Sequence, residues 1–215
     1  MEIRTFAEGD RAELRELFGR AGEGAPTASL WGHLDSEAAI YLDPYMDLEP
    51  ESLFVAVVDG AMVGYLTGSL GDGFPGFDTL MTKAIKEHRL LFKRGPAAFF
   101  ARSMADAARA AIRRRPVAGD LNDDRWPAHL HINVAPEARG TGAADGLMER
   151  WLARVTASGS PGCHLQTLVE NTRAVRFFER VGFVPHGPTP VVLGVRHQGA
   201  PVHQLTMVWT PDRPG

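Results

Sequence analysis

A turn rich in glycine and alanine is the part of the sequence best suited to holding an anion. It lies within Val134-Ala-Pro-Glu-Ala-Arg-Gly-Thr-Gly-Ala-Ala144. The small residues leave backbone N–H groups open to a ligand, and the helix expected to follow adds the positive end of its dipole, an arrangement that holds diphosphates. The turn has neither the Gly-Lys-Ser/Thr of a P-loop nor Gly-x-Gly-x-x-Gly, so two nucleotide-binding alternatives lose support. A purely structural Gly-rich turn is the alternative that the pattern leaves open.

Two histidines precede this turn in the segment Ala128-His-Leu-His-Ile-Asn-Val-Ala135, which reads as a strand. Because strand side chains alternate, His129, His131 and Asn133 share one face. A neutral imidazole there could act as a general base, and His131 is the nearer of the two to the turn. The alternatives are a hydrogen-bonded histidine packed in the sheet, and a metal site shared with His164, for which no carboxylate motif is evident.

The elements that would position these residues follow from hydrophobic periodicity. Asp59-Gly60 joins two strands as a tight hairpin, and a strand, helix, strand order makes the segments 128–135 and 163–169 parallel, with a right-handed crossover. Two helices between the third and fourth strands form a helical excursion. The expected strands are 2–6, 53–58, 62–67, 128–135, 163–169, 190–195 and 202–209, and the expected helices include 79–92, 96–115, 142–158 and 172–181.

Composition limits the class of protein. With 215 residues, 44% of them hydrophobic and 23% charged, the chain is expected to form one globular domain. A formal net charge of -3 provides no global field for nucleic acid or an anionic membrane, although local basic patches can occur. Cys163 is the single cysteine, which excludes an internal disulfide and a Cys-rich zinc site. Without a signal-like or membrane-spanning segment, we expect a cytoplasmic protein.

Two motifs resemble the GNAT superfamily of acetyltransferases. Arg139-Gly-Thr-Gly142-Ala-Ala144 matches its pyrophosphate motif Gln/Arg-x-x-Gly-x-Gly/Ala, and Asn171-Thr-Arg-Ala174-Val-Arg-Phe-Phe178-Glu-Arg-Val-Gly182-Phe183 is similar to its Asn-x-x-Ala-x-x-Phe-Tyr-Glu-x-x-Gly-Phe segment. The resemblance runs along nearly the whole chain. Within the superfamily, the stretches 43–51 and 126–134 resemble bacterial relatives of the acetyltransferase-like domain of protein O-GlcNAcase.

The resemblance implies a fold and a cosubstrate. The fold is α/β, with a central, mostly antiparallel mixed sheet, splayed parallel fourth and fifth strands, flanking helices and a helical insertion at about 71–128, all in one domain covering 1–215. The cosubstrate is acetyl-CoA, whose pantetheine arm would pair with the open edge of the fourth strand. The implied cofactor-binding residues are Asn133, Val134, Ala135, Arg139, Gly140, Thr141, Gly142, Ala143, Ala144, Asn171 and Phe178.

The implied reaction moves an acetyl group to a primary amine directly, in a ternary complex. An alkylamine with a pKa near 10.4 is about one part in a thousand unprotonated at pH 7, so His131, with His129 as a second candidate, would assist its deprotonation. The family often uses a Tyr to protonate the leaving thiolate, but Phe178 occupies that position and has no proton to donate. Tyr41, Tyr45 or Tyr65 could substitute, or the thiolate could leave unaided. A covalent relay through Cys163 is disfavoured because an isolated Cys in an apolar strand is usually buried.

Three interpretations therefore stand side by side. The first is an N-acetyltransferase acting on a small-molecule or peptide amine, as a monomer or homodimer, without nucleic acid or membrane partners. The second is a CoA-binding or peptide-binding module that has lost turnover, which Phe178 makes reasonable. The third, an oligomerising or nucleic-acid-bound regulator, rests on Arg113-Arg-Arg115, although this run is better explained as complementing the negative end of its helix. The identity of the acceptor depends on the segments 21–52 and 71–126, which are expected to be loops.

Overall fold

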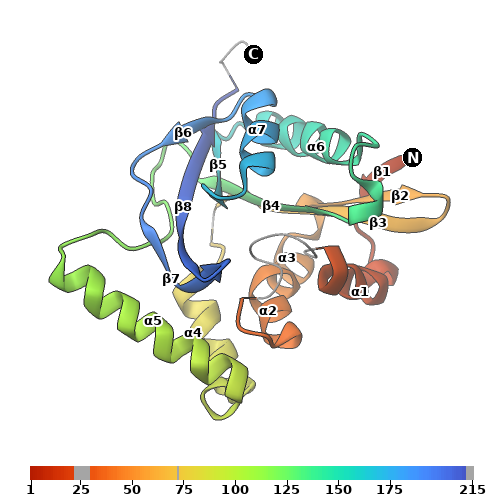
Figure 1. Ribbon diagram of the computed structural model, residues 1–215. Helices are drawn as coiled ribbons and strands as arrows, with labels where there is room; N and C mark the ends of the chain where they lie inside the picture. Colours follow the sequence, from red (N-terminus) through yellow and green to blue (C-terminus); the bar gives the residue numbers. More distant parts are fainter. Residues whose placement is uncertain (22–29, 72, 212–215) are drawn as a thin grey trace.

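A mixed β-sheet runs through the protein, with helices on both of its faces (Figure 1). The structure, a computed structural model, describes residues 1–21, 30–71 and 73–211. The strands follow the spatial order β1-β2-β3-β4-β5-β8-β6, with β7 paired to β8, and the pair β4–β5 is parallel. Their bounds are β1 Glu2–Thr5, β2 Leu53–Val58, β3 Ala61–Ser69, β4 Ala128–Val134, β5 Cys163–Leu168, β6 Val184–His186, β7 Val191–His197 and β8 Ala200–Trp209.

The helices divide between the two faces of the sheet. Figure 1 shows α6 and α7 on one side of β4 and α1 to α3 on the other, while α5 runs along an outer edge of the molecule. The bounds are α1 Arg11–Ala21, α2 Leu34–Tyr41, α3 Asp43–Leu48, α4 Phe77–Glu87, α5 Arg94–Ile112, α6 Ala143–Ala157 and α7 Thr172–Arg180, with 3-10 turns at η1 Glu8–Asp10, η2 Pro50–Ser52, η3 Leu90–Phe92 and η4 Pro136–Ala138.

Side chains alternate along β4, so its apolar residues and its histidines lie on opposite faces of the sheet. Leu130 packs into an apolar cluster with Leu147 and Trp151 of α6. A Cβ at Gly68 of β3 would overlap the Trp151 ring, so glycine lets α6 approach the sheet closely. His129 and His131 project to the opposite face, against Tyr45 of α3. The fold therefore keeps one face of β4 apolar and turns its polar residues toward α2 and α3.

The secondary structure confirms most of the sequence prediction. The hairpin turn at Asp59 and Gly60 has φ angles of 51° and 81°, and β4 and β5 are parallel. Two helices, α4 and α5, occupy the excursion between β3 and β4, and the observed fold is the mixed sheet expected for the superfamily.

The expectation of loops at 21–52 was wrong for α2 and α3, and β6 was missed; residues 22–29 of that segment lie outside the described part of the chain. The cause is visible in α2, which buries Ser36 and Glu37 as well as Ala38 and Ile40. The Glu37 carboxylate accepts hydrogen bonds from the N–H groups of Trp31 and Gly32, both at 3.0 Å. A helix that buries polar as well as apolar side chains does not show the apolar stripe from which helices are predicted.

Candidate active site

The pairing of β4 with β5 stops soon after it starts. Ala128 and His129 pair with Cys163 and His164, yet β4 continues to Val134 and β5 to Leu168. The Ala135 N–H donates to the Val63 carbonyl beside β3 at 2.8 Å. Because backbone groups alternate along a strand, the N–H and C=O of Val134 then face the side where β5 has diverged. This unpaired edge can accept an extended ligand in the place of a strand.

The predicted anion-binding turn directly follows that edge. Gly140 and Gly142 have φ angles of 82° and 87°, a region that glycine adopts without strain, and a Cβ on Gly140 would meet no atom within 4 Å. The Thr141 hydroxyl donates to the Ala138 carbonyl at 2.7 Å, which closes the turn. Gly142 is the N-cap of α6, so the first N–H groups of this helix, at Ala143 and Ala144, lack intrahelical acceptors.

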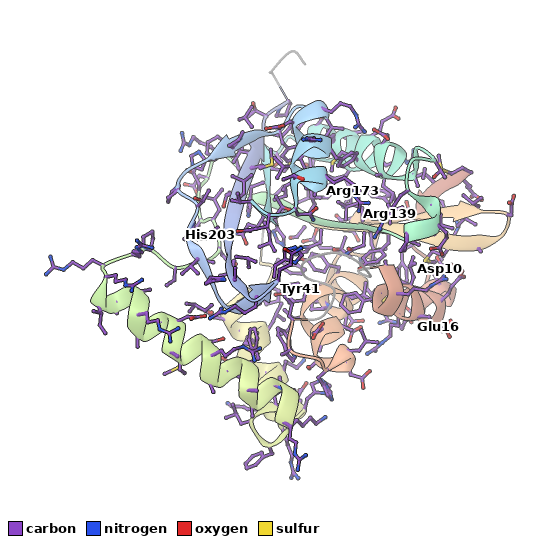
Figure 2. The ribbon with its side chains drawn as sticks, viewed as in Figure 1. Asp10, Glu16, Tyr41, Arg139, Arg173 and His203 are labelled. Atoms are coloured by element: carbon purple, nitrogen blue, oxygen red, sulfur yellow. The ribbon has the colours of Figure 1, made fainter. Side chains whose placement is uncertain are left out.

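Two arginines from different elements lie beside the turn. Figure 2 shows Arg139, which follows η4, close to Arg173 in the first turn of α7. Burial lowers the pKa of Arg139, and the neighbouring charge of Arg173 lowers it further. A basic residue in the first turn of a helix is opposed by the helix dipole. An anion at this place would relieve both repulsions, which makes Arg173 a further candidate for anion binding.

The two histidines of β4 differ in their bonding. His129 Nε2 lies 3.0 Å from the Tyr45 hydroxyl. His131 contacts the edges of Tyr41 and Tyr45, at 5.7 and 5.8 Å between ring centroids, and makes no hydrogen bond within the described residues. Burial, and then nearby histidines, lower the pKa of His129 to about 3 and that of His131 to about 4. Both rings are therefore neutral near pH 7, and His131 has the uncommitted nitrogens.

Each of the three tyrosines considered from sequence reaches this face of the sheet. The Tyr45 hydroxyl is engaged with His129, and the Tyr65 hydroxyl accepts a hydrogen bond from Asn133 Nδ2 at 2.9 Å. Tyr41, labelled near the centre of Figure 2, has no hydrogen bond among the described residues and lies against His131. Burial raises the pKa of all three phenols, so each keeps its proton.

The second sequence motif begins with a helix cap. Asn171 Oδ1 accepts a hydrogen bond from the Ala174 N–H at 3.3 Å, so the N-cap role is observed, and its contact with a cofactor stays a prediction. Phe178 is 6% exposed and packs against Phe177 and Phe183 in the apolar cluster under α6. Its contact with the cofactor likewise stays a prediction.

Cys163 has the environment of a buried thiol. It is fully buried at the start of β5, and burial raises its pKa to about 12. A thiol that stays protonated is a poor nucleophile, which disfavours a covalent relay. For the metal alternative, His164 directs Nδ1 to the Trp126 carbonyl at 2.7 Å, and no group of three metal-ligating side chains is placed to hold an ion within the described residues.

The fold thus brings together three features: a parallel strand pair that diverges, a glycine turn at a helix N-terminus, and a polar face beside them. The sequence matches the model of the acetyltransferase (GNAT) family over residues 12–183. The chain belongs to the GNAT acetyltransferase family. Acetyl transfer is the activity of that family.

Solved structures share the fold of this GNAT protein at low sequence identity. A putative acetyltransferase from Salmonella typhimurium, yncA, solved with its cofactor acetyl-CoA, has 15% identity and a TM-score of 0.60, covering 99% of this chain and 95% of its own. The ribosomal-protein-alanine N-acetyltransferase of Brucella melitensis has 15% identity and a TM-score of 0.59, covering 98% and 99%. Chaetomium thermophilum Naa20, solved with a bisubstrate analogue, has 18% identity and a TM-score of 0.57, covering 98% and 86%.

Proposed function

We propose that this GNAT protein transfers the acetyl group of acetyl-CoA to a primary amine directly, in a ternary complex. The observation that carries the proposal is the early end of the β4–β5 pairing immediately before the Gly140–Ala144 turn. It offers an open strand edge for an amide-containing arm and, next to it, N–H donors for a diphosphate. An acyl-CoA contains both groups.

The residues present fit this cosubstrate. The turn is free of side-chain obstruction at Gly140, and Arg139 and Arg173 provide positive charge beside it. Val134, and by the same alternation Ile132, would offer backbone groups to the pantetheine amides. Bound there, acetyl-CoA would supply the thioester whose acetyl group is transferred.

His131 is the residue we propose as the proton acceptor. The amine must lose a proton as its nitrogen forms the new bond to the acetyl carbon, and a neutral imidazole without other hydrogen bonds can receive it. A pKa of about 4 keeps the ring neutral at physiological pH but also makes it a weak base. The desolvated surroundings that lower this pKa would also favour an uncharged amine, so burial assists the same step. His129, held by Tyr45, would act as a positioning residue.

Tyr41 is the residue we propose as the proton donor. When the carbon–sulfur bond breaks, CoA leaves as a thiolate, and a thiol pKa near 8.5 makes it a tolerable leaving group even without help. A protonated phenol beside His131 could still supply the proton and then be restored from the imidazole. This assignment explains how the site could function with Phe178 at the position of the family's usual Tyr.

The second candidate is a CoA-binding module without turnover, which the absence of a hydroxyl at Phe178 favours. Continuous detection of free CoA with a panel of amines separates the two, since binding alone releases none. The panel should contain aliphatic amines, aminoglycosides, amino acids and lysine peptides. CoA release that depends on an amine supports the enzyme, while acetyl-CoA binding without release for every amine supports the module. CoA release with lysine peptides and with no other amine of the panel would favour a relationship to the acetyltransferase-like domain of protein O-GlcNAcase.

A further inference from the structure

The outward surface of α5 is apolar where the exposed side of a helix is normally polar. Met104 and Ile112 are 73% and 83% exposed, and Ala101, one turn before Met104, and Ala105 and Ala108 are exposed as well. These five residues follow helical spacing and form one stripe. The opposite side of α5 packs on β7 through Phe99 and Ala110, which are buried. The helix is thus apolar on two opposite sides.

The turn that leads into α5 exposes further apolar side chains, and these are larger. Leu91 and Phe92 of η3 are 56% and 89% exposed. Together with Met104 and Ile112 they account for four of the nine exposed large hydrophobic residues in the described part of the chain. Figure 1 shows this turn at one extremity of the molecule, where α4 meets α5. We call η3 and the outward stripe of α5 the arm surface.

The segment that carries the arm surface has a charge opposite to that of the remaining protein. Residues 77–115 contain ten of the 23 Lys and Arg but three of the 26 Asp and Glu, giving a formal charge of +7. The rest of the chain carries -10. Arg94, Arg113 and Arg115 are exposed at the two ends of α5, and Arg102 and Arg109 border its stripe. The apolar stripe is therefore framed by positive charge.

We propose that the arm surface docks on an anionic membrane surface, with its apolar side chains entering the interface and its basic residues among the lipid headgroups. Amphipathic helices that bear Lys and Arg beside exposed apolar residues lie in the plane of such interfaces. No helix within the described ranges is long and apolar enough to cross a membrane, so the association is peripheral.

Charge and area disfavour the other occupants. A second copy would bring two +7 segments together, and a helix of 19 residues, about 28 Å long and about 10 Å wide, covers far less than the about 800 Å² per partner of a stable interface. Nucleic acid requires donors that point at phosphates, whereas the middle of the stripe offers methyl and thioether groups. The test below can identify either of these occupants.

The test is co-sedimentation of the full chain with vesicles of phosphatidylglycerol and phosphatidylcholine, compared with vesicles of phosphatidylcholine alone. We expect at least about tenfold stronger partition to the anionic vesicles, weakened by salt because the basic residues are exposed. The double variant Met104→Glu with Ile112→Glu should lose at least about tenfold, and Arg94→Gln with Arg113→Gln and Arg115→Gln should remove most of the anionic preference. Leu48→Glu, at a residue 56% exposed on α3, is the matched control and should bind as the wild type does.

Equal partition to both vesicle types, or unchanged binding of the Met104→Glu, Ile112→Glu variant, would overturn the proposal. Self-association in sedimentation velocity that this variant abolishes, without vesicle binding, would identify a second copy as the occupant instead. Salt-sensitive binding to duplex DNA without vesicle binding would identify nucleic acid. Because both substituted residues are over 70% exposed, acetyl-CoA affinity should stay within about twofold and verify folding. The test is independent of acetyl transfer.

Discussion

His131 differs from His129 in one respect that matters for chemistry: its ring has no hydrogen-bond partner within the described structure, while His129 is bonded to Tyr45. We predict that His131→Ala lowers kcat by about a hundredfold or more and leaves the Kd of acetyl-CoA within about twofold. Calorimetry and CoA-release assays measure the two quantities separately. The pH profile of the wild type should show no histidine limb near 6.5, because the folded pKa of about 4 keeps His131 neutral down to that pH.

A structural role for His131 would give a different result. The variant would then lose thermal stability while its folded fraction turned over at a near-normal rate. The matched control is His197→Ala on β7, remote from β4 in the sheet order, which should change neither kcat nor the pH profile. Deprotonation of the amine would pass to water if His131→Ala retained full activity.

Tyr41 is assigned as proton donor because the other two phenols are already engaged. Tyr41→Phe removes the hydroxyl and keeps the ring that packs on Trp31, Phe77 and His131. We predict a loss of about tenfold in kcat, with the KM for acetyl-CoA nearly unchanged, since CoA is a tolerable leaving group without protonation. Tyr65→Phe is the control for loss of a buried hydroxyl. An equal effect of both substitutions would argue that neither phenol donates the proton.

At the scale of an element, a negative charge introduced into the turn before α6 should have the strongest effect on acetyl-CoA binding. We predict that Gly142→Asp weakens acetyl-CoA binding at least tenfold, because a carboxylate would stand at the helix N-terminus where a diphosphate is expected. Isothermal titration calorimetry measures the loss. Unchanged affinity in a folded Gly142→Asp protein would remove the main support for this location of the cosubstrate.

The positive φ of Gly142, 87°, means that any side chain adds strain, so the charge must be isolated by controls. Gly142→Asn has the same shape as Asp without the charge and tolerates this conformation. It should retain clearly more affinity than Gly142→Asp. Gly159, after the opposite end of α6, has a φ of 74° and open space around it, so Gly159→Asp repeats the strain far from the turn. Its affinity should equal that of the wild type.

Sequence patterns predicted the strands, turns and helices that are determined by residues close together in the chain. The Asp59-Gly60 hairpin and the strand, turn and helix from Ala128 to Ala157 are specified by turn chemistry and periodicity. The helix α2 is not, because Glu37 is buried there by hydrogen bonds to Trp31 and Gly32 that no periodicity reveals. β6 escaped notice because three residues are too few to show alternation.

Sequence predicts the parts of the candidate site that lie in one continuous segment, but not the contacts between distant segments. The turn and both histidines follow from a single stretch of sequence, but the pairing of Tyr45 with His129 joins residues 84 positions apart. Arg173 is not among the cofactor-binding residues that the family resemblance implies. Its place in the first turn of α7, where the helix dipole disfavours a cation, was the one local indication that an anion belongs nearby.

At the scale of the whole molecule, the small net charge is the sum of two regions of opposite charge. A total of -3 argued against anionic partners, yet it is the sum of +7 on residues 77–115 and -10 elsewhere. The expectation that no membrane is involved rested on the total, whereas binding depends on the local field within about 10 Å of a surface at moderate salt. The regional charge and the exposure of Phe92 and Ile112 together lead to the proposed membrane contact.

The free energy of unfolding should depend on pH because His129 and His131 are buried. Burial holds the pKa of His129 at about 3 and that of His131 at about 4, while in the unfolded chain both would titrate near 6.5. Below 6.5 the unfolded state therefore binds more protons than the folded state. The stability gained by keeping these rings neutral is fully present above that pH and is lost as the pH falls toward 4.

We predict that the free energy of unfolding declines from pH 6.5 to pH 5 and that His131→Gln reduces the slope. One histidine that is protonated in the unfolded state alone contributes up to about 1.4 kcal/mol per pH unit, and Gln removes that contribution while keeping a polar group of similar size. Urea denaturation at several pH values measures the slope, and His197→Gln is the control that should leave it unchanged. A slope equal to that of the wild type in His131→Gln would mean that the folded protein already protonates His131 in this range. A ring charged at pH 5 to 6 would no longer be the neutral acceptor on which the proposed mechanism depends.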